Sequence, residues 1–308
     1  MVELLDPGEN TQHLLTGNAA IARGALEAGV SVVAAYPGAP SSEIAENLSS
    51  IADKRNIYVE WSANEKVSME VAAAASFANL RALCPMKHNG MNVASDFLLH
   101  LDGSEIRGGL VLVSCDDPGG LYGRDRGESR HVARMAEIPC LEPADLQEAK
   151  DMTRWAFELS EDLGSVVFLR SVTGISHAGG NVTYGKLPDT RNRAHFDFDG
   201  YIHGRDEGMS TPELSSTRQV LAQEKIQRSI EVFEDSPFNS YTGPEKPEVL
   251  LIACGACHLY SKEAISVLGV QERVGLLKMG TIWPLPPKFL QRYLALADKV
   301  IIVEEAAP

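Results

Sequence analysis

Three short clusters of polar and small residues stand out in the N-terminal part of this 308-residue chain. The first is Tyr36-Pro-Gly-Ala-Pro-Ser-Ser-Glu43, the second is Trp61-Ser-Ala-Asn-Glu65-Lys66, and the third is Met86-Lys-His-Asn-Gly-Met-Asn-Val93. They contain carboxylates, a lysine, a histidine and asparagine amides, which are side chains that bind ligands and move protons. The clusters are candidates for one functional site if the fold brings them together.

Each cluster lies where a predicted strand ends and a predicted helix begins. Val30–Tyr36 is a continuous apolar run, typical of a parallel strand buried on both faces, and it ends at Pro37-Gly38. Ile57–Trp61 and Ala82–His88 are predicted strands as well, and a helical pattern follows each of them. Because the carboxyl ends of parallel strands line the ligand crevice of a doubly wound sheet, the three clusters are expected to converge.

The alternation of strands and helices continues to about residue 176. Further strands are predicted over 110–114 and 166–170, and helices over 18–28, 42–54, 65–79, 91–101 and 145–159. Ser41 and Ser42 are suited to cap the helix that runs to about Lys54. We therefore expect an α/β domain over residues 1–176, built on a doubly wound, mostly parallel sheet.

Residues 177–246 break this rhythm. The segment 177–210 is predicted to be a loop, one helix is predicted over 211–234, and a linker with several prolines follows. A structureless stretch this long is unusual inside a compact domain, so an extended linker that wraps a partner or a neighbouring domain is expected.

A second, smaller α/β unit is predicted over residues 247–308. Its strands are expected over 249–253, 274–279 and 300–303, and its helices over 259–268 and 286–296. The sequence stops just after a strand, whose next connection usually supplies a covering helix. An incomplete domain is therefore expected, with its remainder either cut off or carried by another chain.

Composition narrows the class of protein. With 44% hydrophobic and 23% charged residues, the chain has the profile of a soluble globular protein, and it lacks a long apolar run that could span a membrane. The N-terminus has no basic region of a secretory signal, so a cytoplasmic location is expected. A net charge of −14 argues against nucleic acid as a partner, and five scattered cysteines suit a reducing compartment.

The three clusters together resemble the signature of indolepyruvate ferredoxin oxidoreductase alpha subunits, which belong to the thiamine-diphosphate-dependent 2-oxoacid:ferredoxin oxidoreductase family. The other matching runs are Asp116-Asp-Pro-Gly119, Leu141-Glu-Pro143, Gln147-Glu-Ala-Lys-Asp-Met152, Ser236-Pro-Phe-Asn239 and Trp283-Pro-Leu-Pro286. No single run is decisive, but their order and spacing extend the resemblance over nearly the whole chain. The second unit is then expected to be similar to the C-terminal domain of transketolase.

The resemblance implies oxidative decarboxylation of an aryl 2-oxo acid, similar to indolepyruvate, to its acyl-CoA and CO₂, with ferredoxin as the electron acceptor. The implied cofactor is thiamine diphosphate, which this chain would share with a diphosphate-binding domain or subunit. The sequence has neither the Gly-Asp-Gly motif followed by Asn that binds Mg²⁺ and diphosphate nor a ferredoxin-like cysteine series. Mg²⁺ and iron–sulfur clusters are therefore expected on partners, and no metal on this chain, which is not expected to act alone.

Matching the family motifs places the glutamate that hydrogen-bonds the aminopyrimidine ring at Glu65. That bond makes the cofactor's own amino group basic enough to remove the thiazolium proton. A carboxyl group in this role needs a poorly solvated pocket, and the Ala-rich stretch Val71–Ala75 of the next helix suits close packing around a ring. The residues alone leave open that Glu65 is an ordinary first-turn acid favoured by the helix dipole.

The resemblance also suggests which residues contact the ligands. Tyr36, Pro37, Gly38 and Asn89 are expected at the cofactor, together with Glu65. For Asn89 an alternative stays open, because Asn89-Gly90 also has the composition of a simple turn.

Ala39, Lys87 and His88 are expected at the substrate. His88 is the second catalytic candidate, since it could contact the substrate carboxylate or the developing enolate, whereas Lys87 could equally be solvated. The family usually has threonine where this chain has Ala39, and the run after Gly119 also departs from the family. Altered or non-oxidative thiamine-diphosphate chemistry, or a structural or regulatory subunit, are the alternatives, and Glu65 argues against the last.

Two further patterns leave alternative interpretations open. Arg124, Arg126, Arg130 and Arg134 form the most basic stretch of the chain, which could meet the phosphates of coenzyme A or an acidic ferredoxin, or could be a solvated loop. Cys254-Gly-Ala-Cys257-His258 matches haem-attachment and thioredoxin-like patterns, but without export or a second cysteine pair we interpret it as two ordinary thiols.

Overall fold

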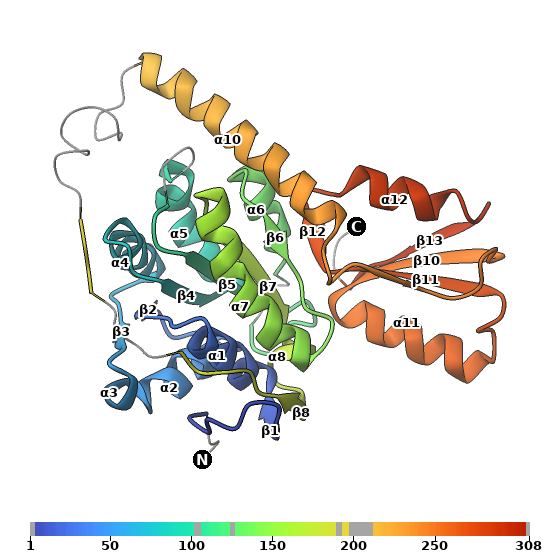
Figure 1. Cartoon of the computed structure of the whole chain (residues 1–308), viewed down its shortest axis with the longest axis horizontal. Coiled ribbons are helices and arrows are strands. Elements are labelled where there is room, and N and C mark those ends of the chain that lie inside the picture. Colours follow the sequence, from blue (N-terminus) through green and yellow to red (C-terminus); the bar gives the residue numbers. More distant parts are fainter. Residues whose placement is uncertain (1–3, 102–105, 124–126, 189–192, 197–211, 306–308) are drawn as a thin grey trace.

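A seven-stranded sheet forms the centre of the molecule (Figure 1). This computed structural model describes residues 4–101, 106–123, 127–188, 193–196 and 212–305. In spatial order the strands of the sheet are β12 (Thr281–Trp283), β6 (Cys140–Leu141), β7 (Val167–Val172), β5 (Leu110–Asp116), β4 (Ala82–Lys87), β2 (Val32–Ala35) and β3 (Tyr58–Trp61). Every neighbouring pair is parallel except β12 with β6. The mostly parallel α/β sheet predicted from the sequence is confirmed.

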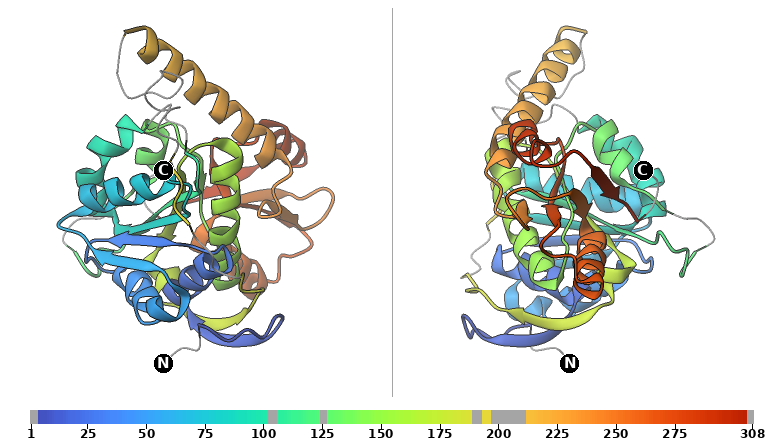
Figure 2. Two further views of the ribbon diagram at one scale, coloured as in Figure 1. Left: turned by 60° about the vertical axis from the view of Figure 1, so that its left-hand side comes forward. Right: turned by 90° about the vertical axis from the view of Figure 1, so that its right-hand side faces the viewer.

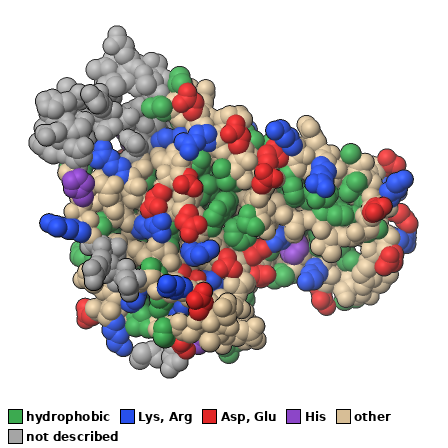
Figure 3. Space-filling view, in the orientation of Figure 1, with side chains coloured by type: hydrophobic (Ala, Val, Ile, Leu, Met, Phe, Trp, Pro, Cys, Tyr) green, Lys and Arg blue, Asp and Glu red, His purple; other side chains and the backbone are tan. Residues whose placement is uncertain are grey.

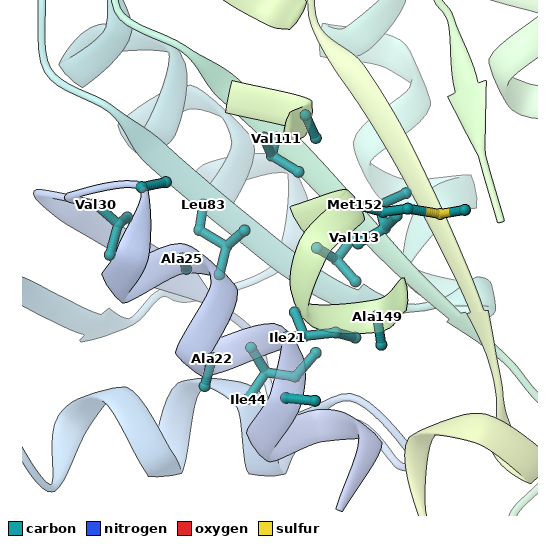
Figure 4. Packing of buried hydrophobic residues seen from close by; sticks show 14 of the residues in the cluster. Ile21, Ala22, Ala25, Val30, Ile44, Leu83, Val111, Val113, Ala149 and Met152 are labelled. Carbon is teal, nitrogen blue, oxygen red and sulfur yellow. The ribbon is translucent and has the colours of Figure 1, made fainter. Parts of the chain in front are cut away.

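Helices cover both faces of this sheet, because its central strands are apolar on both sides. Leu83 of β4 and Val111 and Val113 of β5 belong to one hydrophobic cluster, whereas the alternate residues of the same strands belong to another (Figure 4). The first cluster includes α1 (Gly17–Glu27), α2 (Ser42–Ser49) and α7 (Leu146–Leu163). The second includes α4 (Glu65–Phe77), α5 (His88–His100) and α6 (Arg130–Met135). The sheet is therefore doubly wound.

Two local predictions on the first face were wrong. The single helix expected to run to Lys54 is divided into α2 and α3 (Ala52–Arg55), and Ser50 and Ile51 separate them. Ser41 is the N-cap residue of α2, but neither serine hydroxyl caps the helix. The Oγ atoms of Ser41 and Ser42 instead donate to the carbonyl oxygen of Gly38, at 2.8 and 3.2 Å, and so fix the preceding loop.

The segment expected to be a long linker contains more regular structure than its composition suggested. β8 (Gly179–Thr183) pairs antiparallel with β1 (Gln12–Thr16) in a two-stranded ribbon near the N-terminus (Figures 1 and 2). After the helix α10 (Pro212–Glu234), β9 (Ser240–Thr242) joins a third sheet. The loop predicted over 177–210 is therefore wrong for β8, and residues 189–192 and 197–210 lie outside the described part.

The third sheet builds the C-terminal unit. Its strand order is β13 (Val300–Val303), β10 (Val249–Cys254), β11 (Val274–Met279) and β9. The helices α11 (Gly255–Leu268) and α12 (Pro287–Leu294) lie on opposite faces of this sheet (Figure 1). The chain then links the two units directly, because β12, which follows β11, pairs with β6 of the large sheet.

In the part of the chain that the structure describes, no helix is both long and apolar enough to cross a bilayer. Acidic and basic side chains are interspersed on the face seen in Figure 1, with apolar side chains between them (Figure 3). This face therefore carries no extended field of one sign.

The packing of α1 on α7 depends on a glycine in the middle of α1. A β-carbon at Gly24 would lie 2.2 Å from the carbonyl oxygen of Lys150 in α7, and backbone cannot move aside cheaply. Close approach rather than helix propensity therefore decides which residue fits here, since alanine would otherwise be the better helix former by about 1 kcal/mol.

We expect Gly24→Ala to lower the stability of the chain by about 1–3 kcal/mol, the usual cost of overpacking a dense interface. Thermal and denaturant unfolding measure the effect. Gly179→Ala is the matched control, because nothing lies within 4 Å of the added methyl group there. An equally or more stable Gly24→Ala protein would contradict this account of the α1–α7 contact.

Candidate functional site

The three polar clusters meet at a point where the chain changes from one face of the sheet to the other. β2 and β4 are neighbours in the large sheet, but β2 leads into α2 on one face and β4 leads into α5 on the opposite face. Loops that diverge in this way leave a crevice at the carboxyl ends of the strands. Side chains from the ends of β2, β3 and β4 are therefore positioned around one crevice.

The loop after β2 touches the end of β4 through Gly38. A β-carbon at Gly38 would lie 2.8 Å from Cδ and 2.9 Å from Cγ of Lys87, so the aliphatic part of the lysine passes directly over the glycine. Lys87 is the last residue of β4 and the N-cap residue of α5. The contact brings the first and third clusters together.

The second and third clusters meet at Glu65. This residue is the first of α4, and the side chain of Asn64 caps the helix by accepting a 3.0 Å hydrogen bond from the backbone N–H of Val67. Glu65 is only 6% exposed, and a β-carbon at Gly90 would lie 2.6 Å from its Oε1. No hydrogen bond or ion pair to another described residue involves its carboxylate.

The electrostatic influence of Glu65 reaches the interior of the sheet. Burial raises the pKa of the Cys84 thiol in β4 above its ordinary value, and the nearby charge of Glu65 raises it further. The carboxylate thus lies in a weakly solvated environment, where its interactions are stronger than in water.

His88 lies in the first turn of α5, although the sequence predicted that this helix would begin only at Met91. Both ring nitrogens are buried, and neither has a hydrogen-bond partner in the described part of the chain. The imidazole also acts on Asp117. Burial raises the pKa of Asp117, but hydrogen bonds from Tyr122, Leu121 and Thr173 and the charge of His88 lower it to below its ordinary value.

The other predicted site residues lie at the rim of the crevice. Tyr36, Pro37 and Ala39 are exposed, with Tyr36 at 36%, and the Ala39–Pro40 peptide bond is cis. Asn89 is half-buried and is the second residue of α5, so the turn interpretation of Asn89-Gly90 is wrong.

Sequence reasoning missed Asn18, a fully buried residue near the start of α1. Its Nδ2 donates to the carbonyl oxygen of Pro40 at 2.7 Å and to Glu43 at 3.3 Å, while its Oδ1 is buried without a partner. Asn18 therefore holds the loop after β2 in place. A lone amide in an Ala-rich helix was the only signal in the sequence, and it does not reveal a partner.

A buried cluster of charged side chains lies beside the crevice, at the carboxyl ends of β5, β6 and β7. Arg170 donates from Nε to Asp116 and from Nη1 to Glu142, both at 2.7 Å, and its Nη2 lies 3.5 Å from Glu128. Burial lowers the pKa of Arg170, but the charges of Glu142, Asp116 and Glu128 raise it well above its ordinary value. Arg170 is therefore the permanent cation of the cluster.

Arg130 extends this cluster to the C-terminal unit. It donates to Glu128 at 2.7 Å and to Glu304, just after β13, at 2.5 Å. The interpretation of the basic stretch as a solvated loop is therefore wrong for Arg130. Arg134 lies over the ring of Trp283 at 5.3 Å, and Arg124 and Arg126 lie outside the described residues.

The two cysteines of the Cys-x-x-Cys pattern are free, with Cys254 at the end of β10 and Cys257 in the first turn of α11. Burial, together with the charges of Glu305 and Glu142, raises the pKa of Cys257 to about 11, and burial raises that of Cys254 as well. Thiols with such pKa values are poor nucleophiles near neutral pH, so the interpretation as ordinary thiols is supported. Among the residues that the structure describes, no group of three or more His, Cys, Asp and Glu side chains is arranged to hold a metal ion.

The fold and the site define a doubly wound α/β protein with a buried glutamate, Glu65, among the polar residues at the carboxyl ends of its strands. Comparison with the sequence profiles of known families identifies this class of protein. The sequence profile for the thiamine-diphosphate-binding region of pyruvate flavodoxin/ferredoxin oxidoreductases matches residues 23–193, and the chain belongs to this family.

Curated relatives match nearly the whole chain. It is 42% identical over 302 residues to the indolepyruvate oxidoreductase subunit IorA of Pyrococcus abyssi, which covers 98% of this chain and 46% of the relative. The IorA subunit of Archaeoglobus fulgidus is 39% identical over 311 residues, covering 99% and 49% of the two chains. The chain thus spans about half the length of these relatives.

The fold is similar to that of solved structures. A 2-oxoglutarate:ferredoxin oxidoreductase from Magnetococcus marinus superimposes with a TM-score of 0.76 at 17% identity, over 96% of this chain and 58% of that one. A split-gene transketolase, an inactive β4 tetramer, superimposes with a TM-score of 0.57 at 13% identity, over 95% and 80%. At these identities the likeness establishes the fold alone.

The buried charge cluster carries more carboxylates than guanidinium groups, and Glu142 shows the consequence. Its Oε2 is buried without a partner. Burial raises the pKa of Glu142, Arg170 and Arg130 oppose that effect, and the net pKa remains above the ordinary value. Because the folded protein then binds a proton that the unfolded chain releases, this contribution to stability is complete below the ordinary glutamate pKa and is lost as the pH rises through the folded-state pKa.

We expect Glu142→Gln, which imitates the protonated acid, to be at least as stable as the wild type at pH 8 and to lose less stability between pH 5 and pH 8. The difference should be about 1 kcal/mol for each unit by which the pKa is raised. Glu128→Gln is the control of opposite sign, since burial raises the pKa of Glu128 but Arg130 and Arg170 lower it below the ordinary value. Denaturant unfolding across this pH range measures both, and a Glu142→Gln protein with the pH profile of the wild type would contradict the assignment.

Proposed function

We propose that this chain is the pyrimidine-binding part of a thiamine-diphosphate-dependent 2-oxoacid:ferredoxin oxidoreductase. The reaction is oxidative decarboxylation of an aryl 2-oxo acid, similar to indolepyruvate, to its acyl-CoA and CO₂, with the electron pair passing to ferredoxin. The relatives named indolepyruvate oxidoreductase support the substrate class. The neighbour from Magnetococcus marinus, which holds 2-oxoglutarate, coenzyme A and succinyl-CoA, supports a 2-oxo acid and coenzyme A as reactants.

Glu65 is the single observation that carries the proposal. Glu65 is 6% exposed and its carboxylate has no partner among the described residues, and glycine at position 90 leaves room for it, because a β-carbon there would lie 2.6 Å from Oε1. A buried carboxylate without a partner is costly unless a ligand completes its bonding. These features fit an aminopyrimidine ring, whose nitrogen offers a hydrogen-bonding group to a carboxyl.

When bound, thiamine diphosphate supplies the carbanion chemistry that decarboxylation of a 2-oxo acid needs. Within this chain, Glu65 holds a proton at the pyrimidine nitrogen, and its burial keeps water from competing for that bond. Tyr36, Pro37, Gly38 and Asn89 line the rim from the ends of β2 and β4 and orient the ring.

Lys87 and His88 are the groups that we assign to the substrate. Gly38 supports the stem of Lys87, and His88 follows at the start of α5, so a cation and an imidazole stand together at the crevice. An ammonium group and an imidazole N–H both suit the carboxylate or carbonyl oxygen of a 2-oxo acid. The side chain of Ala39, across the loop from them, offers no hydrogen bond.

The remaining parts of the reaction are assigned to partners. Mg²⁺ and the diphosphate would be held by a diphosphate-binding domain or subunit, and the electrons would pass through a ferredoxin or an iron–sulfur subunit. The sequence of this chain offers neither the Mg²⁺ motif nor the cysteine series that these functions need.

Glu65→Gln tests the role of the carboxyl group in the assembled enzyme. The amide keeps the size of the side chain but cannot share a proton with the ring, so we expect turnover to fall by about 10²–10⁴. Exchange of the C2 proton of the bound cofactor with solvent, followed by NMR after acid quench, should slow while cofactor binding persists. Glu70→Gln in the same helix is the control, and wild-type exchange in Glu65→Gln would rule out the assignment.

Ala39→Thr tests whether the substrate grip differs from the family pattern. A hydroxyl placed at a carboxylate contributes about 1.5–3 kcal/mol, so specificity constants for some 2-oxo acids should change by about tenfold to a hundredfold. Ala39→Val controls for shape, because valine and threonine differ only in the hydroxyl. Steady-state kinetics over a panel of aryl and alkyl 2-oxo acids measures the effect, and equal specificity of the two variants would contradict it.

A further inference from the structure

The segment that leads into α6 packs on His88 through a glycine. A β-carbon at Gly127 would lie 1.9 Å from both Cγ and Cδ2 of His88 and 2.4 Å from Nδ1. The α-carbon of Gly127 therefore sits directly against the imidazole ring. This close approach to the ring is enough by itself to require glycine here.

Hydrogen bonds to the end of β5 hold this segment in place. Ser129, two residues after Gly127, donates to Asp116 from its backbone N–H at 2.9 Å and from its Oγ at 2.6 Å. Asp116 is itself fully buried and receives the Nε of Arg170. Gly127 cannot move away from His88 unless these bonds are broken or the chain between them bends.

The groups around His88 already have partners of their own. The backbone N–H of Tyr122 donates to Asp117 at 2.6 Å, and the hydroxyl of Thr173 lies 3.2 Å from the same carboxylate. The imidazole nitrogens, in contrast, are buried and have no partner among the described residues. Proteins keep buried polar groups in this condition mainly where a ligand or a water molecule completes the bonding.

We propose that Gly127 is a positioning residue that seats the imidazole of His88 so that its ring nitrogens serve an oxygen atom of the bound 2-oxo acid. The inference rests on the proposed function for the identity of that ligand. It assigns a role to Gly127, which directly follows the run after Gly119 that departs from the family pattern. A side chain at this position would turn the imidazole aside, and it would do so without a large cost to the fold, because a ring on rotatable bonds can move where backbone cannot.

Chemical modification of the whole chain tests whether Gly127 holds the imidazole of His88 in place. Diethyl pyrocarbonate reacts with accessible imidazole nitrogens, and mass spectrometry follows each of the eight histidines separately. We expect His88 to react slowly in the wild type and about tenfold faster in Gly127→Ala, since the ring then loses its cover. Gly119→Ala, where the nearest atom to the new methyl group is 3.6 Å away, is the control. An unchanged rate at His88 in Gly127→Ala would overturn the proposal.

A double-mutant cycle in the assembled enzyme tests whether the contact between Gly127 and His88 contributes to catalysis. We expect Gly127→Ala to lower kcat/KM for the 2-oxo acid by about a hundredfold, as misplacement of a positioned group by about 1 Å does. In the His88→Ala background the same substitution should change kcat/KM by no more than about twofold, because there is no imidazole left to displace. Equal losses in both backgrounds would mean that Gly127 acts on something other than His88.

The two measurements separate this inference from the proposed function. If the assembled enzyme has no activity on 2-oxo acids, the proposed function fails, while the modification rate still reports whether Gly127 seats His88. If Gly127→Ala does not fold, Ser129→Ala replaces it, since it weakens the tie to Asp116 without adding volume. Ser129→Ala should then accelerate modification of His88, and a wild-type rate in that variant would refute the positioning role of Gly127.

Discussion

The structure is organised around the buried guanidinium of Arg170. Its hydrogen bonds to Asp116 and Glu142 join the ends of three neighbouring strands, β5, β7 and β6, at the edge of the sheet where the crevice lies. Such a pair adds little net stability over an apolar contact, but truncating one partner, so that it no longer accepts a hydrogen bond from the guanidinium, typically costs about 3–5 kcal/mol because Arg170 is left buried and charged. Arg170 therefore adds little stability of its own. It restricts the loops after these strands, because they must place carboxylates beside its guanidinium. Only one arrangement of those loops supplies the carboxylates that it needs.

The same cluster couples the site to the C-terminal unit. Glu142 approaches the first residue of α11 so closely that a β-carbon at Gly255 would lie 2.0 Å from its Oε1, and Gly255 has a φ of +50°. Arg130 reaches Glu304 from the other direction. Burial raises the pKa of Glu305, Arg170 and Arg130 oppose that effect and Glu142 adds to it, and the net pKa remains above the ordinary value. Glu142 and Glu305 are therefore two groups near the junction of the units whose raised pKa values link proton uptake to folding.

Much of the fold could be predicted because its signals are local. The buried strands Leu110–Asp116 and Val167–Val172 appear as largely apolar runs, and the helix α4 begins at Glu65 as predicted. The pairing of Gln12 with Thr183 could not be predicted, because its residues are far apart in the sequence and its strands are too short and polar to identify. The same holds for Asn18 and Arg170, whose roles depend entirely on which distant groups the fold brings to them. Sequence reasoning therefore found the polar clusters at the ends of the strands and missed the residues that hold them there.

The side chains at the crevice are all held in place in the same way, which explains why the residues that hold them could not be predicted. Gly38 supports Lys87, Gly90 supports Glu65 and Gly127 supports His88, in each case by backbone that approaches the side chain too closely for any β-carbon. Packing of this kind fixes a side chain without consuming its donors or acceptors, whereas a hydrogen bond from the protein would occupy them. The ring nitrogens of His88 are consequently buried without partners among the described residues, and no other described residue pairs with the carboxylate of Glu65, a residue that is 6% exposed. A site that must offer its full hydrogen-bonding capacity to a ligand is expected to use glycine contacts for positioning, and ion pairs only behind them, as Asp116 and Arg170 do here.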